Sequence, residues 1–223
     1  MSKDNVAKHR ADFIKETRQK LSQEEHLIEG YSRLDERFFD KTIISALKDK
    51  YTDKLTQASV MVPFLYESNA ISLLLTKRSK KLNEHAGEIC FPGGRWAPGD
   101  KSLTCTALRE TQEEIGANKE SIEIIGFLKS IPTLTGYLIH PVVGVLDSNS
   151  SIVIDKSEVD SYFLAPLSFF LDKNNKKKKL HFIKSIQIPV YEYQFEGHRI
   201  WGATAAIISS LCKTLTPRVR RQN

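Results

Sequence analysis

Three glutamates within five residues constrain this chain more than any other feature of its sequence. They follow a Gly-Gly pair at residues 93 and 94 and one arginine, Arg109. Their spacing of i, i+3 and i+4 places the three carboxylates on one face of a helix, at about 100° per residue. The members of this acidic cluster are Glu110, Glu113 and Glu114. The opposite face, which we expect to pack against the fold, carries Thr104, Leu108, Thr111 and Ile115.

Carboxylates this close repel one another, so the acidic cluster lowers stability unless a cation neutralises it. Oxygen ligands on a helix suit Mg²⁺ or Mn²⁺, which prefer carboxylates together with substrate phosphates. We therefore predict that Glu110, Glu113 and Glu114 are metal ligands, and that Arg109 pairs with Glu113 and orients it. A backbone carbonyl of the Gly-Gly pair is expected to complete the metal shell, since glycine allows a close approach. A solvent-exposed acidic face is the alternative, and the flanking glycines favour the metal site.

The segment from Gly94 to Gly116 resembles the signature sequence of the Nudix hydrolases. That pattern is a glycine, five residues, an acid, seven residues, Arg-Glu, an aliphatic residue, any residue, Glu-Glu, any residue and a glycine. This chain departs from it in three places: Asp100 is the acid, eight residues separate it from Arg109, and Thr111 replaces the aliphatic residue. The resemblance implies an α/β/α sandwich with a mixed sheet.

A second stretch resembles the motif that marks the coenzyme A diphosphatase branch of this family. It comprises Leu74-Leu75-Thr76-Lys77-Arg78-Ser79, Leu82, His85, Gly87-Glu88 and Phe91-Pro92-Gly93-Gly94. Pro98, Asp100 and the extra residue between Asp100 and Arg109 also fit that branch. With Pro132-Thr133 and residues 201–205, the resemblance covers roughly residues 57–212. One departure is Asn83, which stands where the branch has an arginine.

This second resemblance implies hydrolysis of the diphosphate of coenzyme A (CoA) or acyl-CoA, giving 3′-phosphoadenosine 5′-phosphate and 4′-phosphopantetheine or its acyl form. Arg78 and His85, with Gly93 and Gly94, are the implied substrate contacts. The general base is one of the three glutamates or a carboxylate such as Glu158. The alternatives are another Nudix substrate (ADP-ribose, a dinucleotide or an RNA cap) or a ligand-binding module without catalysis.

Two further contacts are predicted at the substrate. The 3′-phosphate is expected to meet a basic group, for which the motif offers Arg78 with Lys77, Lys80 and Lys81 close by. Trp96, beside the glycines, is suited either to stacking on an adenine or to packing at the surface. The sequence alone does not choose between these roles.

The net charge of +6, from 33 Lys and Arg against 27 Asp and Glu, favours phosphorylated substrates. Much of it lies in two runs, residues 176–179 and 218–221, which we interpret as a solvated loop and a basic tail; neither has the interleaved aromatic residues of a nucleic-acid surface. Three cysteines without a CxxC pair predict no disulfide framework. The sequence shows no leader peptide and no membrane span, and we expect a cytoplasmic protein.

The order of elements predicts a helical extension over residues 1–50, a hydrolase domain over 51–217 and a basic tail over 218–223. The extension has two predicted helices, and the second carries an apolar stripe that must be covered by the domain or by a second copy in a homodimer. Strands are predicted at 59–66 and 71–76 as a hairpin, at 87–91, and near 122–130, 137–146, 181–187 and 189–195. Helices are predicted at about 101–115, capped by Asp100, and at 202–215.

Overall fold

The computed structural model of the protein describes residues 3–25, 55–67, 70–133, 135–183 and 186–216. The second predicted N-terminal helix, the boundary at residue 50 and the basic tail lie outside these residues. The helices are α1 (Lys3–Lys20), α3 (Leu103–Ile115), α4 (Leu167–Leu171) and α5 (Gly202–Leu215), with 3₁₀ turns η2 (Lys119–Ser121) and η3 (Lys173–Asn175). The strands are β1 (Thr56–Glu67), β2 (Ala70–Arg78), β3 (Ile89–Cys90), β4 (Gly93–Arg95), β5 (Ile122–Phe127), β6 (Ile131–Pro132), β7 (Tyr137–Leu146), β8 (Val159–Pro166), β9 (Lys177–Ile183), β10 (Ile186–Phe195) and β11 (His198–Trp201).

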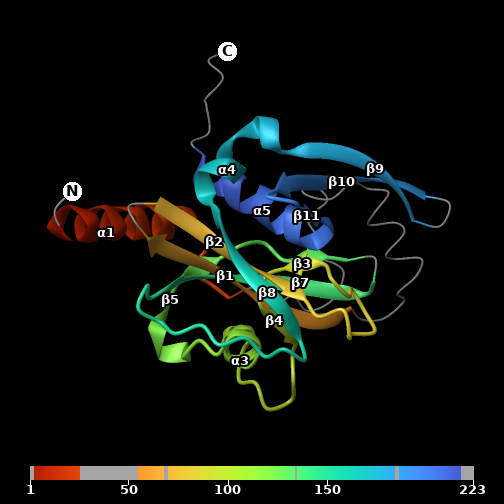
Figure 1. Ribbon diagram of the computed structural model, residues 1–223, viewed down its shortest axis with the longest axis horizontal. Coiled ribbons are helices and arrows are strands. Elements are labelled where there is room, and N and C mark those ends of the chain that lie inside the picture. Colours follow the sequence, from red (N-terminus) through yellow and green to blue (C-terminus); the bar gives the residue numbers. More distant parts are fainter. Residues whose placement is uncertain (1–2, 26–54, 68–69, 134, 184–185, 217–223) are drawn as a thin grey trace.

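A mixed sheet forms the middle layer of the molecule. Its central path runs β3-β2-β1-β7-β5, with β4, β6 and β8 paired at its sides. The β1–β7 pair is parallel and the other pairs in this sheet are antiparallel. Helix α3 covers one face, while α5 and the three-stranded sheet β11-β10-β9 lie over the other (Figure 1). This arrangement confirms the predicted α/β/α sandwich.

The two faces of the sheet bury separate sets of apolar side chains. Met61, Leu65 and Leu74 face α3 and pack with Ile115. Alternate residues of the same strands face α5, because successive side chains of a strand point to opposite faces. On that side the core includes Val62, Phe64, Leu73 and Leu75, with Ile207 and Leu211 of α5.

The predicted hairpin, glycine segment, α3 and α5 are confirmed, and several other elements differ from the prediction. β8, β11 and α4 were not predicted, because β8 mixes acidic, serine and aromatic residues without a clear alternation and the other two are short. β8 pairs with β2 at the side of the sheet. The lysine run predicted to be a loop leads into β9 instead, which begins at Lys177.

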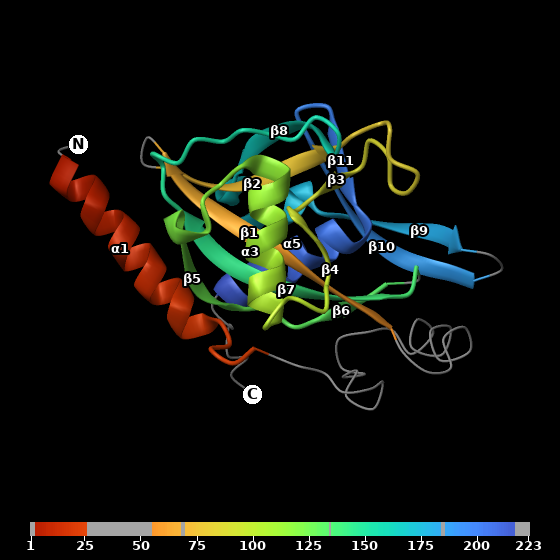
Figure 2. The ribbon, with the colours of Figure 1, turned by 90° about the horizontal axis from the view of Figure 1, so that it is seen from below.

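The N-terminal helix lies against the edge of the sheet (Figure 2). Phe13 meets Phe64 edge to face, with 5.1 Å between ring centroids, and Leu21 is buried in the core facing α5. Beyond α1, Ser22 pairs with Phe127 at the end of β5. Gly126 makes this crossing possible, since a Cβ there would lie 2.6 Å from the Leu21 Cβ. Within the described ranges, no helix combines the length and hydrophobicity needed to cross a membrane.

Candidate active site

Helix α3 carries the acidic cluster and is fixed at both ends. Ser102 is its N-cap and accepts a hydrogen bond from the Cys105 amide at 3.2 Å. The prediction that Asp100 caps the helix is therefore wrong. At the other end, Gly116 adopts a left-handed conformation (φ 67°) and its amide donates to the Gln112 carbonyl. Glycine suits this C-terminal position because it has no Cβ to oppose the left-handed backbone.

A residue of the N-terminal segment also reaches the start of α3. The Glu25 carboxylate accepts a hydrogen bond from the Thr104 amide at 2.8 Å. It thus satisfies a first-turn donor that has no partner within the helix, and places negative charge at the positive end of the helix dipole. The extension therefore touches the helix that carries the acidic cluster.

The three glutamates differ sharply in exposure. The Glu113 side chain is 54 % exposed, Glu110 is 15 % exposed and Glu114 is only 2 % exposed. The predicted division of α3 into a chelating face and a packing face is therefore wrong, because Glu114 lies among the buried residues with Ala107 and Ile115. Thr104 and Leu108 of the predicted packing face are only half-buried.

The Gly-Gly pair begins β4, which runs antiparallel to the first residues of β1. A Cβ on Gly94 would lie 2.3 Å from the Glu110 carboxyl carbon, and one on Gly93 would lie 2.4 Å from the Ser59 carbonyl oxygen. Gly93 also has a φ of 154° that side-chain-bearing residues rarely adopt. The backbone of the pair therefore lies directly against a carboxylate of the acidic cluster.

Arg109 holds three carboxylates together. It donates to Glu113 at 2.9 Å, which confirms the predicted pairing, and to Glu110 at 2.8 Å. It also forms a two-pronged contact with Asp100, at 3.0 Å to each oxygen. This hydrogen bonding lowers the pKa of Asp100 from 3.8 to about 2. Asp100, the acid of the signature sequence, therefore links Arg109 to the loop before α3. Arg109 in turn links the acidic cluster to the same loop.

Glu114 is buried without a matching positive charge in contact. Its nearest cation is Arg78 Nη1 at 3.9 Å from Oε1. The pKa of Glu114 is raised from 4.5 to about 8, chiefly by burial; Arg78 opposes this rise, and the charges of Glu110 and Glu158 add to it. Burial also raises the pKa of Glu110. Of the implied substrate contacts, Arg78 therefore faces the acidic cluster directly.

These residues fit a divalent cation. Glu114 Oε2 is buried and has no hydrogen-bond partner, and Arg78 Nε is likewise without one. A metal ion beside Glu110 and Glu114 would neutralise the crowded charge and satisfy this oxygen. The described residues contain no group of three acidic, histidine or cysteine side chains already arranged to hold a metal. Glu113 lies apart from the other two glutamates of the acidic cluster, because Arg109 holds it at the exposed side of the helix.

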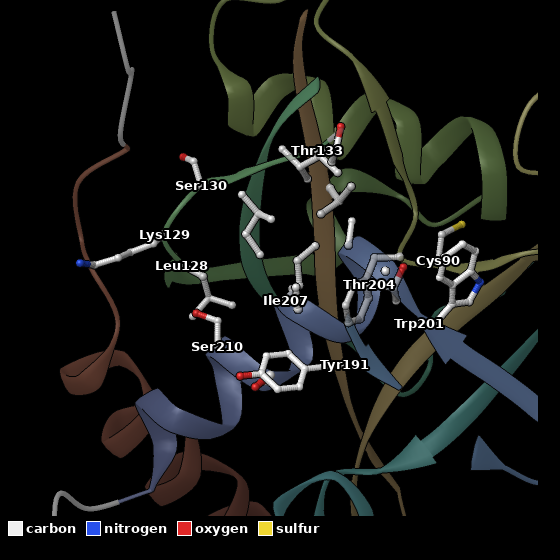
Figure 3. Close-up of a pocket in the computed structure, with 18 of the residues that line it drawn as sticks. Cys90, Leu128, Lys129, Ser130, Thr133, Tyr191, Trp201, Thr204, Ile207 and Ser210 are labelled. Atoms are coloured by element: carbon white, nitrogen blue, oxygen red, sulfur yellow. The ribbon is translucent and has the colours of Figure 1, made fainter. Parts of the chain in front are cut away.

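A large cleft of about 1640 Å³ lies between the sheet and α5. It is lined at one end by Arg78, His85, Gly93 and Gly94, so all four implied substrate contacts border it. From there it follows α5, where Thr204 and Ile207 point into the pocket together with Leu128 and Tyr191 (Figure 3). One continuous cleft therefore joins the substrate motif to the C-terminal helix.

Two motif residues, His85 and Asn83, and the nearby Trp96 contribute little to the shape of this cleft. His85 Nδ1 lies 3.0 Å from Glu88 Oε2, and its positive φ of 56° marks a tight turn. Asn83 is exposed and is not among the residues lining the cleft. Trp96 is 45 % exposed, also lies outside the lining, and donates its indole N–H to the Asp100 carbonyl. These positions favour the packing role for Trp96.

Several lining residues could not be identified as site residues from the sequence. Tyr137 joins Arg95 at the mouth of the cleft, through a hydrogen bond to its hydroxyl and a guanidinium 5.1 Å from its ring centroid. Trp201 lines the cleft near Cys90. Tyr191 of β10, Lys176 just after η3 and Lys213 of α5 also come together. Apart from Trp201, which lies in the resemblance over residues 201–205, the sequence signal was the aromatic and basic composition of separate segments, which does not reveal their proximity.

The sequence is related to known proteins along most of its length. The NUDIX domain family matches residues 55–185. The protein called "Uncharacterized Nudix hydrolase NudL" from Photorhabdus laumondii is 36% identical over 168 residues, which cover 74% of this chain and 87% of that protein. "Nudix hydrolase 3" of Caenorhabditis elegans is 35% identical over 189 residues, covering 77% and 78%. A crystal structure of a C. elegans Ap4A hydrolase binary complex aligns at a TM-score of 0.44 with 20% identity, covering 50% of this chain and 80% of that one.

The fold, the acidic cluster and these relationships define a class of enzyme that acts on phosphoanhydride bonds. The chain belongs to the Nudix family. It is a Nudix hydrolase of a nucleoside diphosphate derivative, and enzymes of this family generally use divalent ions such as Mg²⁺ or Mn²⁺.

Proposed function

We propose that this enzyme hydrolyses the diphosphate of CoA and acyl-CoA, giving 3′-phosphoadenosine 5′-phosphate and 4′-phosphopantetheine or its acyl form. The observation that carries the proposal is the cleft. Residues from the motif of the CoA diphosphatase branch line one end of it, and its volume of about 1640 Å³ exceeds the roughly 300–1,000 Å³ of common ligand pockets. A substrate with a nucleotide and a long pantetheine arm needs such an extended site.

The proposed cofactor is Mg²⁺ or Mn²⁺, held by Glu110 and Glu114 with the backbone of the Gly-Gly pair, and by Glu113 once it leaves Arg109. When bound, the ion supplies neutralisation of diphosphate charge and lowers the pKa of a coordinated water. The crowded and partly unsatisfied carboxylates support this assignment.

The protein side chains have separable proposed roles. Arg78, 26 % exposed at the edge of the cleft and close to Glu114, is placed to contact a diphosphate oxygen through its guanidinium. Arg109 positions Glu110 and Glu113 through hydrogen bonds. Glu158 raises the pKa values of both Glu110 and Glu114. We therefore propose Glu158, as well as the three glutamates, as a candidate general base.

The proposal is tested by a product screen with Mn²⁺ and four classes of substrate: free CoA, acyl-CoA, ADP-ribose and dinucleotides. We expect CoA compounds to have the highest kcat/KM and to release 3′-phosphoadenosine 5′-phosphate, identified by mass spectrometry. A Glu114→Gln variant controls for contaminating phosphatases. Preferred cleavage of ADP-ribose or a dinucleotide would refute the CoA assignment and leave the family assignment intact. No metal-dependent cleavage of any class would favour a ligand-binding module.

A further inference from the structure

Two lysines lie close to one tyrosine ring on the wall formed by α5, β10 and the residue that follows η3. Lys176 Nζ lies 5.0 Å from the centroid of Tyr191, and Lys213 Nζ lies 5.8 Å from the same centroid. All three residues line the cleft. In the part of the chain that the structure describes, neither lysine has a carboxylate partner, whereas nearby Lys179 pairs with Glu192 at 2.6 Å. The two ammonium groups therefore leave positive charge at the cleft.

Two buried hydroxyls lie on the same wall. Tyr193 is fully buried and lines the cleft, and its hydroxyl lies close to that of Ser209 without a well-formed hydrogen bond. Ser209 of α5 is 1 % exposed, and its Oγ lies 3.4 Å from Lys176 Nζ. A buried hydroxyl without a partner is destabilising, and an acceptor oxygen of a ligand would satisfy it. Hydroxyl donors and ammonium groups together suit an anion.

The position of this wall relative to the substrate motif can be measured along α5. The Thr204 hydroxyl donates to the Ile89 carbonyl at 3.0 Å, which fixes the start of α5 beside Cys90 and the substrate motif. Ser209 is five residues further along the helix, a rise of about 7–8 Å at 1.5 Å per residue. The wall therefore lies between one and two helical turns along α5 from the substrate motif.

Two of the four basic residues predicted to meet such a group are engaged elsewhere, and the other two, Lys80 and Lys81, are not among the residues that line the cleft. Arg78 faces Glu114, and Lys77 Nζ lies 3.5 Å from Asp160. A substrate anion remote from the diphosphate therefore needs other cations, and the wall beside α5 supplies them.

We propose that this wall is an anion-binding subsite for a phosphate or carboxylate that the substrate carries away from its scissile diphosphate. The groups that form it are Lys176, Lys213, Ser209 and Tyr193, with the Tyr191 ring close to both ammonium groups. The proposal rests on the proposed function for its two sources of anion, which are the 3′-phosphate of CoA and the free carboxylate of a dicarboxylic acyl group.

The test compares the double variant Lys176→Gln/Lys213→Gln with the wild type on CoA, dephospho-CoA, butyryl-CoA and succinyl-CoA. The matched control is Lys177→Gln, because Lys177 belongs to the same lysine run but is exposed and outside the cleft lining. A phosphate ligand predicts that the double variant loses on the order of tenfold in kcat/KM for CoA, the scale of one charge-assisted hydrogen bond, and little for dephospho-CoA. A carboxylate ligand predicts a comparable loss for succinyl-CoA relative to butyryl-CoA.

An equal loss on all four substrates, or no loss on any, would overturn the subsite. If the wild type cleaves no CoA compound, the proposed function fails, and the subsite is then decided by calorimetry without turnover. Adenosine 3′,5′-bisphosphate should bind the wild type more tightly than AMP, and the double variant should lose that preference. Equal wild-type affinity for the two nucleotides, or a preference that survives in the double variant, would reject the subsite.

Discussion

Replacing Glu114 by glutamine should stabilise the metal-free protein while abolishing its metal-dependent activity. The native carboxyl is 2 % exposed, and its pKa is raised from 4.5 to about 8 by burial, with added repulsion from neighbouring carboxylates. At about 1.4 kcal/mol per pKa unit this corresponds to at most roughly 5 kcal/mol. Since water penetration reduces such penalties, we expect about 2–5 kcal/mol in favour of the glutamine variant.

The size of this stabilisation depends on pH. Because the pKa in the folded state lies above that in the unfolded state, folding carries no penalty from Glu114 below about pH 4.5. The penalty grows from pH 4.5 to about 8 and is constant above that range. The Tm of the chelator-treated variant should therefore exceed that of the wild type at pH 9, by on the order of 5–15 °C, and the two should converge at pH 4.5.

Added Mn²⁺ should reverse this order. The ion should raise the Tm of the wild type and leave that of Glu114→Gln almost unchanged, and turnover of the variant should fall on the order of 10²-fold or more. Glu113→Gln is the matched control, because its side chain is 54 % exposed and should change metal-free stability little. A glutamine variant that is less stable than the wild type at pH 9 would refute the argument from burial. Wild-type rates in both variants at saturating Mn²⁺ would show that these residues are not ligands.

Other predictions concern the supports of α3. Glu25→Ala should lose about 1 kcal/mol of stability and lower turnover, whereas Glu25→Gln, which keeps an acceptor for the Thr104 amide, should restore both; equal Tm and rates in all three proteins would contradict this role. A chain beginning at Tyr51 should melt at a lower temperature or change its mass in light scattering; one that stays folded at unchanged mass but has no activity would show that the missing segment builds the site. Asp100→Asn should cost about 2 kcal/mol at pH 7, because the lowered pKa contributes stability that is present above about pH 3.8 and lost as the pH falls through about 2. The Tm of this variant should accordingly vary less between pH 4 and 2 than that of the wild type, and parallel acid profiles would contradict the ion pair with Arg109.

The parts of the fold that could be predicted are those with strong local signals. The β1–β2 hairpin has two apolar runs separated by turn residues, and α3 and α5 have clear helical patterns with glycine at a boundary. By contrast, β8 mixes acidic, serine and aromatic residues because it lies at the side of the sheet, and its identity as a strand depends on pairing with β2. The lysines of β9 likewise form a strand through pairing with β10 and not through their own propensity.

The acidic cluster could likewise be predicted only in part from the sequence. Helical spacing places Glu110, Glu113 and Glu114 near one another, but it does not say which of them the sheet will cover. Packing of α3 on β1 and β4 buries Glu114 and leaves Glu113 exposed, where Arg109 holds it. The role of Asp100 also changed for a tertiary reason, because Arg109 is a stronger partner for its carboxylate than the start of the helix.

The sequence by itself determined the local features of the site: glycines that admit a close backbone, carboxylates in helical register, and a motif that resembles that of the CoA diphosphatases. Those features are local, so spacing along the chain is enough to bring them together. Only the tertiary structure decided which carboxylate is buried without a partner and how far the cleft extends along α5. It also decided that Glu25 meets α3 and that Lys176 and Lys213 meet one tyrosine. Each of these depends on segments far apart in the chain, whose proximity is set by the packing of helices on the two faces of the sheet.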